Sequence, residues 1–278
     1  MAGIGFELRH MLRKNTLLGL VQAYAYAGVI GSGPWVLSIV GILLIGIFSA
    51  SVVVPGHLVT QFQTSVTYLV ACSLIYTGLV QLAFTRFISD RLFEKQRQLV
   101  LPNLHGLMVF VLIGAGLLGS LALFVLLPGQ SLLYRLLMLA GFTLLCGVWV
   151  LTVLLSGMKR YKAIVALFGL SYGLIVAASL WMRAWGLEGL LGGFVLGHYV
   201  LLAGMWLLIV REFHPARRMV AFDFLQAGKL YPALVAVGFL WNLGIWADKF
   251  MFWFFTPTSQ PIIGHLRASL IYDLPVFL

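Results

Sequence analysis

The chain has 278 residues, of which 62% are hydrophobic and only 9% are charged. Its mean hydropathy is +1.03, and this composition excludes a soluble domain, because soluble domains carry about 25% charged residues. The formal net charge of +10 would suggest a nucleic-acid partner for a soluble chain. In a membrane protein the positive-inside rule explains this charge better. We therefore expect a polytopic membrane protein whose partner is the lipid bilayer, with no nucleic acid bound.

The first 16 residues, MAGIGFELRHMLRKNT, precede the apolar part of the chain. Ile4, Leu8, Met11 and Leu12 fall on one helical stripe, and the charged residues lie elsewhere. This pattern predicts a short amphipathic helix on the membrane surface. A disordered basic N-terminus is the alternative. The apolar run that follows is too long for a cleaved signal peptide.

Seven apolar runs are long enough to cross a bilayer, which requires roughly 20 residues in a helix. They cover residues 17–53, 60–88, 103–127, 131–156, 163–182, 189–210 and 231–255. If these spans alternate in direction, all 18 Lys and Arg fall on one side except Arg135, Arg183, Lys249 and Arg267. The positive-inside rule makes that side the cytoplasm. The N-terminus is thus expected in the cytoplasm, and residues 256–267 on the opposite side.

The first span contains the helix-breaking sequence GVIGSGPW, with Gly31, Gly33 and Pro34 near its middle. Proline removes a helical hydrogen bond and clashes with the preceding turn, so these residues predict a kink. Interrupted helices often line the binding sites of transporters. Glycine also permits plain close packing of membrane helices, and this sequence alone leaves both interpretations open.

The last span, residues 231–255, carries Asn242, Asp248 and Lys249 inside its apolar run. A charge at the centre of a bilayer costs about 2.5–3.5 kcal/mol on the lenient insertion scales, so it usually faces a bundle interior or a wet cavity. Neighbouring helical residues do not face each other, so Asp248 and Lys249 are expected to find separate partners. Lys249 could instead extend to the headgroups. We expect Asn242, Asp248 and Lys249 to contribute polar contacts to a substrate or ion pathway. Asp248, which is too short to reach the headgroups, is the best candidate among them.

No catalytic or metal-binding constellation is predicted. The six histidines have no metal-ligand spacing, and the chain has no Walker loop, nucleophile elbow or dinucleotide fingerprint. Asp90 and Glu94 are flanked by basic residues. This pattern predicts a solvated loop with ion pairs between residues four apart on a helix. Cys72 and Cys146 both lie in apolar spans, which indicates neither a disulfide framework nor a metal site. We expect a protein without cofactor or metal that is not an enzyme.

Five segments of the chain resemble one known family. They are MAGIGFELR, AYAGVIGSGPWVLS, SGMKRYK, GIWADKF and LRASLIYDLPVF, and together they resemble the PelG family. Its members are the multispanning transporter subunits of bacterial Pel exopolysaccharide machinery, and the family is similar to polysaccharide flippases and multidrug exporters. The resemblance covers essentially the whole chain.

The resemblance implies a fold of about twelve helices in two six-helix lobes around a central cavity. On this basis the chain is an all-α polytopic membrane protein, a bundle resembling one six-helix lobe of a flippase-type exporter plus the first helix of the second lobe. Residues 1–16 would be the amphipathic segment, 17–210 the first lobe, 211–229 a basic cytoplasmic linker, and 230–278 the start of the second lobe. The chain is then expected to be the front part of a longer protein.

The resemblance also implies a function and partners. The protein would move a growing N-acetylhexosamine-rich polysaccharide across the bacterial inner membrane. It would work with a cytosolic glycosyltransferase, a membrane scaffold subunit and a subunit that senses cyclic di-GMP. Two alternatives stay open: an ion-coupled exporter of small molecules or lipid-linked oligosaccharides, and a non-transporting membrane anchor for the glycosyltransferase.

Overall fold

The computed structural model describes residues 40–41, 43–45, 56–157, 161–214, 216, 218–226, 231–255, 257–269 and 271–273. The amphipathic segment predicted at residues 1–16 lies outside these ranges. So does most of the first span, including Gly31, Gly33 and Pro34, so the predicted kink lies outside the described residues.

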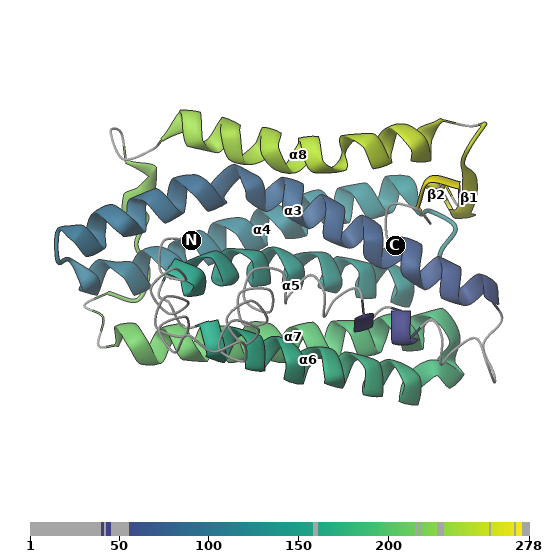
Figure 1. Ribbon diagram of the computed structural model, residues 1–278, viewed down its shortest axis with the longest axis horizontal. Coiled ribbons are helices and arrows are strands. Elements are labelled where there is room, and N and C mark those ends of the chain that lie inside the picture. Colours follow the sequence, from purple (N-terminus) through teal and green to yellow (C-terminus); the bar gives the residue numbers. More distant parts are fainter. Residues whose placement is uncertain are drawn as a thin grey trace, which may run out of the picture.

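Six long helices make up most of the described chain (Figure 1). They are α3 (Gly56–Phe93), α4 (Val100–Leu126), α5 (Leu132–Gly157), α6 (Tyr161–Met182), α7 (Gly186–Phe213) and α8 (Pro232–Phe254). They correspond to the second to seventh predicted spans. By length and composition the described residues hold five stretches able to cross a membrane, and one of these, Ala163–Phe213, runs through most of α6 and all of α7. The fold class of an all-α polytopic membrane protein is confirmed.

The helices pack side by side in one bundle (Figure 1). α6 packs on α7, α7 on α5, and α5 on α3, while α4 lies against α5 and α8 packs on α3. Large side chains fill the centre, one from each of the five helices α3 to α7: Phe62, Leu104, Tyr134, Phe168 and Phe194 are all nearly inaccessible. Because lipid offers no hydrogen-bond partners, helices that satisfy their own backbone groups are the form in which such apolar segments cross a membrane.

Short turns join the helices. The 3-10 turn η1 (Arg97–Leu99) connects α3 to α4, and the 3-10 turn η2 (Arg183–Trp185) connects α6 to α7. Gly186, with a φ of 68°, opens α7 directly after this second turn.

The residues between α7 and α8 bind the beginning of α4. This α7–α8 linker (residues 218–226) includes the 3-10 turn η3 (Asp223–Leu225). The side chain of Asn103, which is fully buried, donates to Asp223 Oδ2 at 3.0 Å and accepts from the Asp223 backbone N–H at 2.8 Å. The Ala221 N–H donates to Pro102 O at 2.9 Å. The end of the bundle where the linker lies is called the linker end below.

A β-hairpin follows α8 at the other end of the bundle, here called the hairpin end (Figure 1). Its strands β1 (Gln260–Ile263) and β2 (Leu266–Ala268) are antiparallel, and Gly264 turns the chain with a φ of 54°. The hydroxyl of Tyr68 on α3 donates to Arg267 O at 2.9 Å. His265 Nδ1 donates to Leu126 O at 2.7 Å, at the end of α4. The segment that follows α8 is therefore fixed to α3 and α4.

Candidate functional site

Asp248 and Lys249 form an ion pair near the hairpin end of α8. Lys249 Nζ lies 3.1 Å from Asp248 Oδ1 and 3.2 Å from Oδ2. The expectation of separate partners is wrong. The two side chains leave the helix in different directions, but the four-carbon stem of Lys249 folds back along the helix and brings its ammonium to the Asp248 carboxylate. Lys249 Nζ also lies 3.2 Å from Ile245 O and 5.6 Å from the centre of the Trp246 ring.

The carboxylate is the more open member of the pair. The Asp248 side chain is 47% exposed and the Lys249 side chain only 13%. Lys249 is therefore folded against its own helix and does not extend toward the headgroups. Asp248 is thus the more exposed member of the pair, and its role as the group that meets a ligand stays a prediction.

Tyr272, which follows the hairpin, is a third member of this group. Its hydroxyl donates a hydrogen bond to Asp248 Oδ2, and its ring stacks on Phe252 with centroids 3.9 Å apart and planes 12° apart. Donation to a carboxylate favours the neutral phenol, so the Asp248 hydrogen bond raises the pKa of Tyr272. The hairpin thus returns the chain to α8 and brings a polar aromatic side chain onto the ion pair.

Buried aromatic rings support this group on the side of α3. Trp253 is 1% exposed, stacks on Tyr68 with centroids 4.6 Å apart, and donates from Nε1 to Asp273 Oδ1 at 2.9 Å. Trp246 is also buried, and its indole N–H has no hydrogen-bond partner among the described residues. These contacts fix the hairpin end of α8, so Asp248 sits on a rigid support.

Asn242 lies apart from the ion pair, at the point where α8 crosses α3. Its amide donates to Gly238 O at 2.9 Å. A Cβ added at Gly78 of α3 would lie 2.7 Å from Gly238 O and 2.8 Å from the Asn242 amide nitrogen. Asn242 is about 9 Å from Asp248 along the helix axis and about 120° away around it. The structure therefore joins two of the three residues predicted on α8 and places the third at the helix crossing.

A row of polar side chains runs along α3, and the sequence analysis missed it. Ser73, Thr77, Gln81, Thr85 and Ser89 stand at every fourth position of α3. Thr77, Thr85 and Ser89 each donate to the carbonyl four residues earlier, at 2.7, 2.6 and 2.8 Å, and Gln81 donates to Thr77 Oγ1 at 3.0 Å. Because these hydroxyl protons are used within the helix, the oxygen lone pairs remain as acceptors. The four-residue spacing was the available signal.

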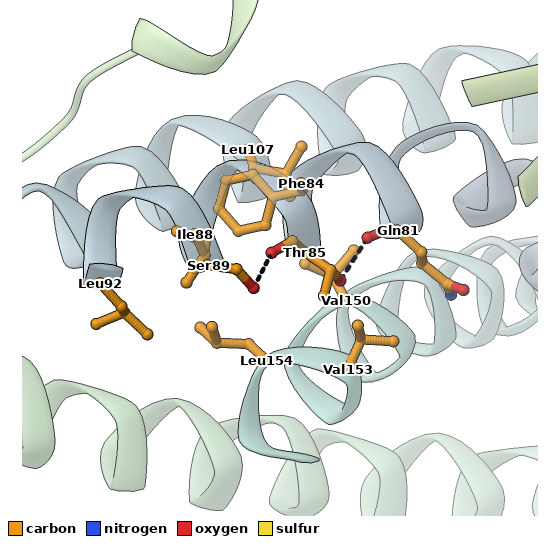
Figure 2. Close-up of a pocket in the computed structure, with 10 residues that line it drawn as sticks. All are labelled: Gln81, Phe84, Thr85, Ile88, Ser89, Leu92, Leu107, Val150, Val153 and Leu154. Carbon is orange, nitrogen blue, oxygen red and sulfur yellow. Dashed lines mark hydrogen bonds between the residues drawn. The ribbon is translucent and has the colours of Figure 1, made fainter. Parts of the chain in front are cut away.

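The linker-end half of this row forms one wall of a crevice of about 60 Å³. Figure 2 shows its polar residues on α3 and three apolar residues on α5. The lining residues are Gln81, Phe84, Thr85, Ile88, Ser89, Leu92, Leu107, Val150, Val153 and Leu154, and none of them is charged. A water needs about 10–15 Å³ of such space, so the crevice has room for a few waters but not for a polymer chain.

No group of three or more His, Cys, Asp or Glu able to hold a metal ion occurs in the part of the chain that the structure describes. The described polar groups along the row on α3 and around Asp248 are instead hydroxyls, amides and the Asp248–Lys249 pair. Such groups exchange hydrogen bonds with polar, uncharged ligands.

The comparison with known families gives one match. All 278 residues, 1–278, match the family model described as "PelG: Putative exopolysaccharide Exporter (EPS-E)". No match was found among curated proteins or among solved structures. The family points to a transporter rather than an enzyme, in agreement with the multi-pass helical fold. The chain belongs to the PelG family of exopolysaccharide exporters.

Proposed function

We propose that this chain moves a growing N-acetylhexosamine-rich polysaccharide of the Pel type across the bacterial cytoplasmic membrane. The N-terminus and the linker end face the cytoplasm, where most basic residues lie. A cytosolic glycosyltransferase delivers the polymer, and a membrane scaffold subunit and a cyclic di-GMP sensor complete the machinery. The family match supports the general role, and the two features below support the path.

The observation that carries the proposal is the distribution of polar groups on the adjacent helices α3 and α8. Gln81, Thr85 and Ser89 occupy the linker-end half of α3. Asn242 lies at the crossing with Gly78, and Asp248 lies about 9 Å from the hairpin end of α8. Between them the two spans thus carry polar groups at the linker end, at their crossing and near the hairpin end. Such groups are costly in a membrane and mark substrate pathways.

The chemistry of these groups suits neutral sugars. The hydroxyl and amide oxygens of Gln81, Thr85 and Ser89 accept hydrogen bonds from sugar hydroxyls and acetamido N–H groups. The apolar wall of the crevice contacts the C–H face of a pyranose ring. At the hairpin end, Asp248 accepts hydrogen bonds from the polymer through its exposed edge. Since the crevice holds only about 60 Å³, passage requires α3 and α5 to separate at the linker end.

Thiol blocking at Thr85 tests this path. In a chain with Cys72 and Cys146 replaced by alanine, Thr85→Cys is expected to export normally and to lose most export after reaction with a membrane-permeant thiol reagent. The added group fills the crevice beside Gln81 and Ser89. Export is measured as polymer released by cells that carry the full-length protein and its machinery.

The matched control is Val109→Cys. Val109 lies at a similar depth on α4, is 43% exposed and does not line the crevice. Its modification should leave export intact. Equal export by modified and unmodified Thr85→Cys would contradict the path. Export of a small cation or drug, blocked at Thr85 in the absence of polymer, would favour the small-molecule exporter instead.

A further inference from the structure

The α7–α8 linker exposes large apolar side chains outside the spanning helices. Met219 is 86% exposed, and Val220, Phe222 and Leu225 are 45%, 45% and 46% exposed. Phe93, the last residue of α3, is 90% exposed. Clustered apolar side chains of this size normally contact a partner or a membrane.

The depth of the linker argues for the membrane. Its hydrogen bonds reach Pro102, Asn103 and His105 of α4, two to five residues inside the helix, which begins at Val100. At 1.5 Å per residue, the linker lies about 3–8 Å below the start of a membrane-spanning helix. Trp206 of α7 donates to His105 Nε2 at 3.2 Å and thus marks the same level. Tryptophan is enriched at membrane–water interfaces.

Basic side chains accompany these apolar ones. Arg218 directly precedes Met219, Arg211 lies in the last turn of α7, and Lys95 lies in the turn after α3, and all three are exposed. Within the described ranges none of the three forms an ion pair, whereas Arg86, Arg91 and Arg97 pair with Asp90, Glu94 and Glu212. This end therefore presents cations to an outside partner.

We propose that the α7–α8 linker is an interfacial segment that binds anionic phospholipid. The side chains of Met219, Phe222 and Leu225 enter the boundary of the acyl chains, and Arg218 with Arg211 contacts lipid phosphates. Juxtamembrane basic residues bind anionic lipid in this way, and apolar side chains at the boundary add buried area. A docked protein is disfavoured, because its polar surface would have to enter the level of α4 residues 102–105.

The linker joins this lipid contact to α8. The Asn103–Asp223 pair fixes it to α4, and α8 begins at Pro232, nine residues after Asp223. Bound lipid would thus hold the linker-end part of α8 against α3, on which α8 packs. The inference concerns a surface separate from the crevice and does not depend on the exported substrate.

Energy transfer to labelled lipids tests the proposal. The purified chain, with its cysteines replaced and Met219→Cys carrying a fluorescent donor, is placed in vesicles containing acceptor-labelled phosphatidylglycerol or acceptor-labelled phosphatidylcholine. The expected result is preferential transfer to phosphatidylglycerol, weakened by salt. Arg218→Gln and Arg211→Gln should each reduce the preference about fivefold, the effect of one basic residue near an anionic surface.

Two further variants separate charge from folding. Arg218→Lys keeps the charge and should keep the preference. Arg135→Gln removes a cation at the hairpin end and should not change it. Equal transfer to both lipids would overturn the proposal. If the fluorophore at residue 219 emits in all vesicles as it does in water, the linker does not enter the membrane. That result would also overturn the proposal and would make the linker a surface for a soluble protein.

Discussion

Gly238→Ala is expected to separate α8 from α3 and to abolish most export. A Cβ at Gly238 would overlap the carbonyl oxygen of Gly78, and a Cβ at Gly78 would lie 2.7 Å from Gly238 O. Both obstacles are backbone atoms, so no side-chain rotation relieves them. Overpacking of this kind costs about 1–3 kcal/mol. The measurement is the thermal unfolding of the purified protein in detergent, together with export in cells.

The same substitution elsewhere on α8 provides the control. A Cβ at Gly244 meets nothing within 4 Å, and alanine is a better helix former than glycine by about 0.8–1.0 kcal/mol in water. Gly244→Ala should therefore unfold at the wild-type temperature or above it, with normal export. If Gly238→Ala were as stable and active as Gly244→Ala, the close crossing of α3 and α8 would not matter to the protein.

Asp248→Asn is expected to insert into the membrane but to lose most export, while Lys249→Gln loses less. The substitution removes the exposed edge of the pair and leaves the Lys249 ammonium, which is only 13% exposed, without its counter-ion. In Lys249→Gln the carboxylate keeps the hydrogen bond from Tyr272. Export and protein level in the membrane are measured together in cells that carry the full-length protein.

The double variant Asp248→Asn/Lys249→Gln distinguishes two causes. If the single variant fails only because a cation is left unpaired, the double variant regains export. If the carboxylate itself meets polymer or a proton, the double variant remains inactive, which is the expected result. Normal export by Asp248→Asn would remove Asp248 from the path. Loss in Lys249→Gln alone would reverse the two roles.

The helices could be predicted from the sequence because each is a long apolar run between polar turns. The predicted run 103–127 becomes α4 (Val100–Leu126), and the run 231–255 becomes α8 (Pro232–Phe254). The apolar character of such a run depends only on its own residues, and the length that it needs is given by the thickness of the bilayer. Local sequence was therefore sufficient for the fold class.

The partners of Asp248 could not be predicted in this way. The angle between neighbouring positions on a helix suggested that Lys249 points away from Asp248. The Lys249 side chain is long enough to reach the Asp248 carboxylate all the same. Tyr272 comes from 24 residues further along the chain, after a hairpin whose strands have only four and three residues. Its place depends on contacts with α3 and α4, which are not local.

The polar row on α3 differs from these cases, because its signal was present in the sequence. Ser73, Thr77, Gln81, Thr85 and Ser89 are all uncharged. A search for charges finds Asp248 and Lys249 and passes over hydroxyls. Their four-residue spacing becomes informative once one helix is known to carry them all and to border a crevice.

Polymer translocation into sealed vesicles tests the central claim most directly. Vesicles would contain the full-length protein and its glycosyltransferase, with the synthase side outward and a labelled nucleotide sugar supplied outside. The account predicts that labelled polymer accumulates inside, protected from an added glycoside hydrolase, and that Asp248→Asn vesicles make polymer but do not protect it. Polymer that is made at the normal rate yet remains fully digestible with the wild-type protein would contradict an exporter and leave only a membrane anchor.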